Sequence, residues 1–134
     1  MAEADLMAES PLNDEATDNR FIRFEAEAGV EVIVNGDQSR KQLACRVIEQ
    51  REAISGQAVR LLESFMRDRG VFDLSSIEVF AGRTADGGDF SLRYTFTAER
   101  DPHEYGYTYF EVYFLCRELP PEPYWPYKFT VGFH

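Results

Sequence analysis

One amphipathic stretch decides the fold, and it reads, over residues 39–70, SRKQLACRVIEQREAISGQAVRLLESFMRDRG. Its apolar residues recur at intervals of three, four and seven positions, which is the spacing that places side chains on one face of a helix. They are Leu43, Val47, Ile54, Ala58, Leu61 and Phe65. The stretch therefore predicts helical structure with one apolar face that packs on another layer.

The ends and the middle of this stretch carry further signals. Ser39 and Gln42 form an S-x-x-Q capping box, which predicts the helix start. Gly70 suits the position just after a helix, so we expect the helix to end there. The Ser55-Gly56 pair interrupts good helix formers. Two forms stay open: one kinked helix, or a helical pair near residues 40–52 and 56–69.

Strand patterns lie on both sides of the helical stretch. Before it, strands are expected from Phe21 to Phe24 and from Val30 to Val34, with Asn35-Gly36 as the turn into the helix. After it the apolar period becomes two. The expected strands there are Ile77–Gly82, Phe90–Phe96, Tyr107–Cys116 and Tyr127–Phe133, with a turn at Thr84–Asp89. The sequence thus predicts an α+β fold, in which an antiparallel β-meander is packed on one face by the helical pair or kinked helix.

Charge separates the N-terminal segment from the rest. The chain of 134 residues has a formal net charge of −10, and more than half of that balance falls within the first 28 residues. Residues 1–19 are also poor in apolar side chains, so we expect a disordered acidic leader there. Residues 20–134 are expected to form a single α+β domain.

The same composition excludes several classes of function. Lys41 and Lys128 are the two lysines of the chain, and no cluster of basic residues occurs, so nucleic-acid binding and binding to an anionic membrane surface are not expected. No apolar run is long enough to span a membrane, and the N-terminus does not resemble a secretory signal. We therefore expect a cytoplasmic protein with Cys45 and Cys116 reduced.

Catalytic and metal-binding patterns are not found in the sequence. The two histidines, His103 and His134, do not occur in any spacing typical of a metal site. There is no nucleophile elbow, and Cys116 lies within an apolar strand pattern. We expect no enzyme activity, no metal and no cofactor.

Two groups of residues are the candidates for contact with a partner. One is acidic and lies around the break at Glu99–Glu104, and the other is the stretch Glu118–Tyr127, where prolines alternate with aromatic residues of the types enriched at binding hot spots. The candidate partner-binding residues are Asp101, Glu104, Glu111, Glu118, Glu122, Tyr124 and Trp125. An alternative stays open for the second group, in which the loop folds its aromatic side chains onto the sheet edge and closes the core.

The order of these features resembles a group of small bacterial domains of unknown function, some of which occur as immunity proteins beside polymorphic toxins. The resemblance covers about residues 20–115 and rests on the S-x-x-Q helix start at Ser39, the segment Glu49–Ile54 and the aromatic residue Phe65 near the helix end. The Pro-rich C-terminal stretch departs from that group. The resemblance implies strands, a helical pair and a strand meander, and a partner that is a toxin domain.

Two hypotheses about function follow. The first is a non-enzymatic protein-binding domain, such as an immunity protein that neutralises a basic toxin domain, since acidic proteins associate faster with basic partners. The second is a small-ligand-binding or regulatory module with a pocket between the helices and the aromatic sheet. The identity of the partner or ligand and the oligomeric state stay open at this point.

Overall fold

The structure is a computed structural model that describes residues 22–27, 30–84, 88–116 and 124–133. The acidic leader expected over residues 1–19 lies outside the described residues, and so do Glu118 and Glu122. Within the described residues, the elements follow one another as β1 (Ile22–Glu27), β2 (Val30–Val34), α3 (Gln38–Glu49), α4 (Arg51–Glu63), β3 (Gly70–Thr84), β4 (Gly88–Ala98), β5 (Thr108–Cys116) and β6 (Tyr124–Phe133).

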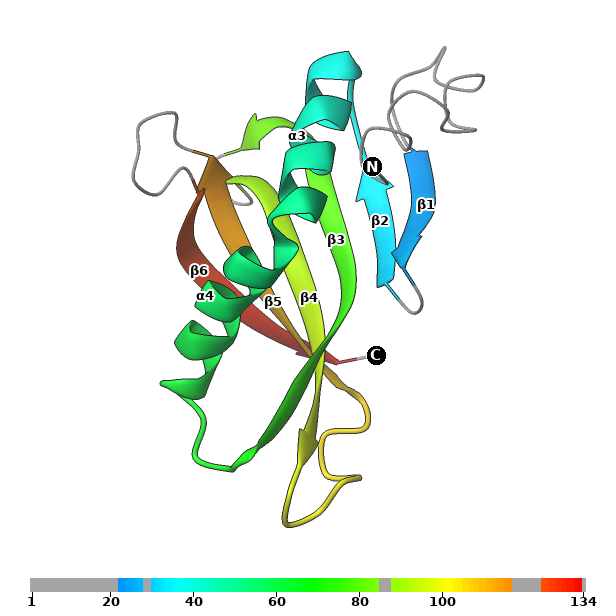
Figure 1. Ribbon diagram of the computed structural model, residues 1–134. Helices are drawn as coiled ribbons and strands as arrows, with labels where there is room; N and C mark the ends of the chain where they lie inside the picture. The colour runs from blue at the N-terminus through cyan, green and yellow to red at the C-terminus, as the bar shows by residue number, and fades with distance from the viewer. Residues whose placement is uncertain (1–21, 28–29, 85–87, 117–123, 134) are drawn as a thin grey trace.

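The strands form one sheet in the order β1-β2-β3-β4-β5-β6 (Figure 1). Strands β3 to β6 pair antiparallel with their neighbours, which confirms the meander over this part of the chain. Strands β2 and β3 are parallel, however, so the sheet is mixed and not purely antiparallel as expected. The reason is the helical connection, because α3 and α4 together carry the chain back along the sheet before β3 begins.

Both helices lie on the same side of the sheet and cover one of its faces (Figure 1). Side chains alternate along each strand, so every second residue points toward the helices. The core between the two layers is apolar, and its largest fully buried side chains include Tyr94, Phe90, Phe114, Ile54, Leu62, Ile77 and Leu92. This arrangement confirms the α+β class and the packing of a helical pair on one face.

The helix boundaries differ from those expected. Asp37 is the N-cap of α3, and its carboxylate accepts a hydrogen bond from the Ser39 backbone N–H at 3.1 Å. The bond that the same carboxylate accepts from the Ser39 hydroxyl is the main cause of a lowered pKa of Asp37. The helix therefore begins before the proposed capping box of Ser39 and Gln42, and the break between the helices falls at Gln50.

The Ser55-Gly56 pair lies inside α4 and does not interrupt it. The Ser55 hydroxyl is hydrogen-bonded to the hydroxyl of Tyr94 at 2.6 Å, and Tyr94 is fully buried beneath the helix. Burial raises the pKa of Tyr94 to about 12. A buried phenol needs a hydrogen-bond partner, so Ser55 joins α4 to the centre of the sheet.

The helix was expected to end at Gly70, but α4 ends at Glu63 and Gly70 is the first residue of β3. A Cβ atom at Gly70 would lie 2.2 Å from the carbonyl oxygen of Thr97 and 2.9 Å from the Cα atom of Ala98. Glycine is therefore needed at this position because β3 and β4 approach each other closely there.

A buried carboxylate fixes one end of the sheet. Asp89, expected in a turn, lies in β4 and is 3% exposed. It forms ion pairs with Arg40 of α3 at 3.2 Å and with Arg83 of β3 at 3.0 Å, and it accepts a hydrogen bond from the backbone N–H of Cys116 at 2.7 Å. One carboxylate thus links a helix and three strands, and its charge is compensated by two arginines.

Neither Cys45 nor Cys116 is in a disulfide, and both are partly buried. Neither of the helices over the described residues is long and apolar enough to cross a membrane.

Candidate functional site on the open face of the sheet

The face of the sheet away from the helices is the first candidate site. We call it the open face, because no helix among the described residues lies over it. The pairing registers place Glu78, Ser91, Tyr113 and Lys128 in one row across β3 to β6, and Ser76, Arg93, Glu111 and Thr130 in the adjacent row. These residues alternate with the buried apolar residues of the same strands, so they point away from the core.

Glu111 lies at the centre of the open face and is the most buried of its charged residues, at 6% exposed. Its carboxylate accepts a hydrogen bond from the Ser91 hydroxyl at 2.5 Å. It also forms an ion pair with the guanidinium of Arg93, which lies directly opposite in the register, at 3.1 Å. Charge-assisted bonds of this kind are stronger and better oriented than neutral ones, so Glu111 holds Arg93 in place.

Arg93 continues into an aromatic contact. Its guanidinium carbon lies 4.0 Å from the ring centroid of Tyr109. A Cβ atom added at Gly132 would lie within 2.3 to 2.7 Å of atoms of the same Tyr109 ring. The ring therefore lies across the glycine of β6 and also contacts the arginine, which fixes a Tyr–Arg pair on the surface.

A second aromatic contact lies in the adjacent row. The rings of Phe80 and Tyr113 are nearly parallel, with centroids 6.4 Å apart, and the ammonium group of Lys128 lies 4.7 Å from the centroid of Tyr113. Burial raises the pKa of Tyr113. The open face thus carries two pairs, each made of a cation and a tyrosine, on neighbouring strands.

Glu78 adds a carboxylate with a perturbed proton affinity. Its pKa is raised, first by burial and then by the negative charge of Glu111. A hydrogen bond from the side-chain amide of Asn35, at 3.3 Å, opposes this effect in part. Like the rest of this face, Glu78 comes from a strand, so its position is set by the sheet and not by a loop.

The structure separates the acidic residues that the sequence groups together. Asp101 and Glu104 lie in the exposed turn between β4 and β5, where the Asp101 carboxylate accepts from the backbone N–H of His103 at 3.1 Å. The backbone N–H of Glu104 donates to the Asp101 carbonyl oxygen at 3.0 Å. Glu111 lies inside β5, where its carboxylate is bonded to Ser91 and Arg93 of the neighbouring strand. The two turn residues therefore shape the turn, and only Glu111 belongs to the open face.

The aromatic candidates are also separated, by the alternation of β6. Tyr124 points into the core, is 5% exposed, and contacts Phe90 edge to face with centroids 5.7 Å apart. This position corrects the expectation that Tyr124 is an exposed contact residue, and its ring packs on the core as the alternative for this stretch expects. Trp125 points the other way, opposite Leu115, and is 44% exposed.

Several residues of the open face were missed from the sequence, above all Arg93, Tyr109 and Tyr113. They occupy the outward positions of strands that were recognised by their apolar residues. The alternation of side chains along each strand could have identified them. It places Arg93 on the same face as Ser91, and Tyr109 on the same face as Glu111 and Tyr113.

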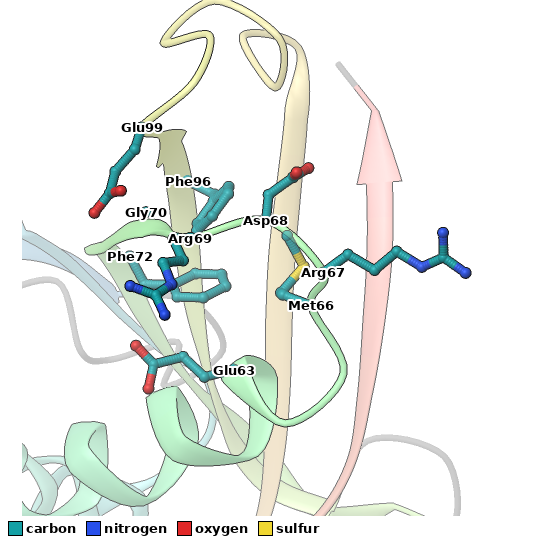
Figure 2. Close-up of a pocket in the computed structure, with 9 residues that line it drawn as sticks. All are labelled: Glu63, Met66, Arg67, Asp68, Arg69, Gly70, Phe72, Phe96 and Glu99. Carbon is teal, nitrogen blue, oxygen red and sulfur yellow. The ribbon is translucent and has the colours of Figure 1, made fainter.

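A second candidate site is a hollow of about 420 Å³ between the end of α4 and the start of β3. Figure 2 shows the side chains of Glu63, Arg69 and Glu99 around it, with the rings of Phe72 and Phe96 behind them and Arg67 extending away. The two rings contact each other, with centroids 4.5 Å apart. The hollow therefore has an apolar floor and a rim of both charges.

The rim is ordered by a tyrosine from the turn after β4. The hydroxyl of Tyr105 donates to the carboxylate of Asp68 at 2.6 Å, and this bond raises the pKa of Tyr105 to about 12. Arg100 lies 3.9 Å from the other oxygen of Asp68. These contacts hold one side of the hollow in a defined shape.

Within the part of the chain that the structure describes, no group of three or more His, Cys, Asp or Glu side chains is arranged to hold a metal ion. Comparisons of the chain with protein-family models, with curated proteins and with solved structures found no match. The assignment of function therefore relies on the geometry of the open face and of the hollow.

Proposed function

We propose that this protein is a non-enzymatic protein-binding domain and that its contact surface is the open face. The observation that carries the proposal is the Arg93–Tyr109 pair, fixed by the buried Glu111 on one side and by Gly132 on the other. Arginine and tyrosine are enriched among the few residues that carry most of the binding energy at protein interfaces. Side chains that are ordered before binding lose less entropy on association, which favours a role in recognition.

The surroundings of this pair support the same reading. Phe80, Tyr113 and Trp125 are partly exposed on the open face and supply apolar area around the charged centre. Protein interfaces commonly combine an aromatic, arginine-containing centre with a polar rim. All of these residues come from β-strands, so the surface is rigid and presents one fixed shape to a partner.

The chemistry of the partner is set by charge. With a net charge of −10, the chain attracts basic proteins over a distance, and this attraction weakens as salt is added. A basic toxin domain fits this requirement, in line with the resemblance to immunity proteins. In this proposal Asp101 and Glu104 act mainly by attracting the partner from an exposed turn, while the open face forms the close contacts.

The test is affinity capture from a lysate of the source cells, with bound proteins identified by mass spectrometry. Arg93→Ala is expected to weaken capture of the partner at least tenfold, as truncation of a central arginine does at many interfaces. Arg100→Ala is the matched control, because Arg100 is 81% exposed and lies near the hollow and not on the open face. Equal capture by the wild-type protein and Arg93→Ala would show that the open face is not the contact surface.

A second function is favoured by the hollow at the end of α4. Its floor of Met66, Phe72 and Phe96 and its charged rim suit a small molecule that carries both an apolar part and a charge. A thermal-shift screen against metabolites distinguishes the two functions. A large shift that is lost in Arg69→Ala, together with no captured protein, would favour a small-ligand-binding module.

A further inference from the structure

The edge of the sheet formed by β6 is a surface that the proposed function does not use. β6 pairs with β5 along one side, and no described strand pairs with its other side. Free edges favour pairing with further strands unless they are protected by proline, bulges or charge. The first half of β6 is protected by Pro126 and by a register shift opposite Tyr113/Phe114. Residues 128–133 contain no proline and no register shift.

Apolar side chains line this unprotected half on the side of the helices. Phe129, Val131 and Phe133 point to the same side, because they are spaced two residues apart along the strand. Val131 is 47% exposed and Phe133 is 76% exposed. Phe65, just after α4, is 67% exposed, and its ring contacts that of Phe129 with centroids 5.1 Å apart. Together these four residues form an apolar stripe beside the free edge.

We infer that the β6 edge pairs antiparallel with the β6 edge of a second copy of this chain, which joins two sheets into one. The register that places apolar side chains on the same side has Val131 opposite Val131 of the second copy. Phe129 then lies opposite Phe133 of the second copy, and Thr130 opposite its Gly132. On the side of the helices, these positions all pair apolar residues with apolar residues, which stabilises an antiparallel pair.

Self-pairing is favoured over pairing with another protein by the charge of the strand. The chain holds 24 acidic residues, yet none lies within residues 124–133. Two copies of an acidic protein repel each other through most of their surfaces, so a carboxylate-free edge is where they approach most easily. A twofold contact uses the same strand on both copies, so the strand must be complementary to itself. Lys128 is the single charged residue of the strand, and this register does not place it opposite Lys128 of the second copy, which avoids a repulsion.

The size of the contact sets its strength. The exposed parts of Phe65, Val131 and Phe133 amount to roughly 300–400 Å² per copy, given the area of aromatic side chains. Stable interfaces bury about 800 Å² per partner, and the paired backbone adds further area to the apolar stripe. We therefore expect a dimer that forms at micromolar concentrations and dissociates on dilution.

Analytical ultracentrifugation over a concentration series tests this inference with the full chain. The wild-type protein is expected to shift from its monomer mass of 15.4 kDa to twice that value as concentration rises. Val131→Glu is expected to weaken dimerisation at least tenfold, since it places two like charges opposite each other at the centre of the contact. Val71→Glu is the matched control, because Val71 is 58% exposed and lies on β3.

A cross-linking variant tests the register itself and does not depend on the stability of a charged variant. Opposite residues of an antiparallel pair are close enough for a disulfide, so Val131→Cys is expected to form a covalent dimer under mild oxidation, and Val71→Cys is not. A wild-type protein that stays monomeric at high concentration would overturn the inference. Cross-linking of Val71→Cys to the same extent as Val131→Cys would overturn it as well.

Discussion

The hydroxyl pair between Ser55 and Tyr94 allows a quantitative test of how α4 is attached to the sheet. The pair is 2.6 Å long, and the Tyr94 side chain is fully buried. Ser55→Ala removes this partner and leaves the buried phenol hydroxyl unsatisfied. The cost of an unsatisfied buried hydroxyl is about 1–3 kcal/mol in the free energy of unfolding.

The second variant removes the other hydroxyl. Tyr94→Phe eliminates the buried polar group itself, and Ser55 is only partly buried, so its hydroxyl has access to other partners. The expected cost is about 0.5–1.5 kcal/mol, the net value of an ordinary hydrogen bond. In the double variant no polar group is left unsatisfied. We therefore expect the double variant to be about as stable as Tyr94→Phe alone. The coupling energy then equals in size the cost of Ser55→Ala, about 1–3 kcal/mol.

The assay is urea unfolding at neutral pH, followed by circular dichroism, for the wild-type protein and the three variants. Ser64→Ala is the control, since the Ser64 hydroxyl also donates a hydrogen bond, to the carbonyl oxygen of Leu61 at 2.7 Å, but in an exposed position. Its cost is expected to be below about 0.5 kcal/mol. Additive effects of Ser55→Ala and Tyr94→Phe would refute the argument that the two hydroxyls act as a pair.

Two further predictions concern the open face. Because the pKa of Glu78 is raised, the folded protein binds a proton on this carboxyl group more tightly than the unfolded chain does. The stability that this proton adds is fully present below the ordinary pKa of 4.5 and is lost as pH rises through the raised pKa. Melting temperatures measured from about pH 4 to about pH 8 should therefore fall less steeply on the neutral side for Glu78→Gln than for the wild-type protein, and an unchanged profile would contradict the assigned cause. Gly132→Ala should displace the Tyr109 ring and destabilise the fold by about 1 kcal/mol, the range of a lost cation–π contact with local overpacking. The control is Gly56→Ala, since a Cβ atom at this position would lie 3.6 Å from its nearest neighbour. It should stabilise α4 by up to about 1 kcal/mol. Both variants are measured by urea unfolding, and equal effects on the free energy of unfolding would be evidence against the packing of the Tyr109 ring on Gly132.

The helices show what periodicity can and cannot predict. Apolar spacing identified both helices and most of their buried face, because packing on the sheet requires that spacing. Phe65, the last residue of the expected stripe, instead lies after α4 and is 67% exposed. The break was placed at Ser55-Gly56 since both residues are poor helix formers, but propensity is a weak signal that tertiary contacts override. Ser55 is retained in α4 by its bond to a tyrosine of β4, which is far away in sequence. The true break at Gln50 carries no comparable signal.

The strands and the site show a different limit. The period of two identifies a strand and its two faces, but it does not say which strand pairs with which, so the parallel pairing of β2 with β3 was not predicted. The same limit applies to the site. Glu111 was grouped with Asp101 and Glu104 because they are close in sequence, whereas its actual neighbours, Ser91 and Arg93, come from the adjacent strand.

The parallel pairing of β2 and β3 has a consequence for how the chain folds. Strands β3 to β6 pair with their neighbours in sequence, so their contacts form with little loss of chain entropy. The pairing of Glu31 with Ser76, in contrast, closes a loop that contains both helices. Closing a long loop is slow relative to forming a hairpin. We therefore expect the meander to form first and to act as the template onto which β2 and β1 are added in the slower step.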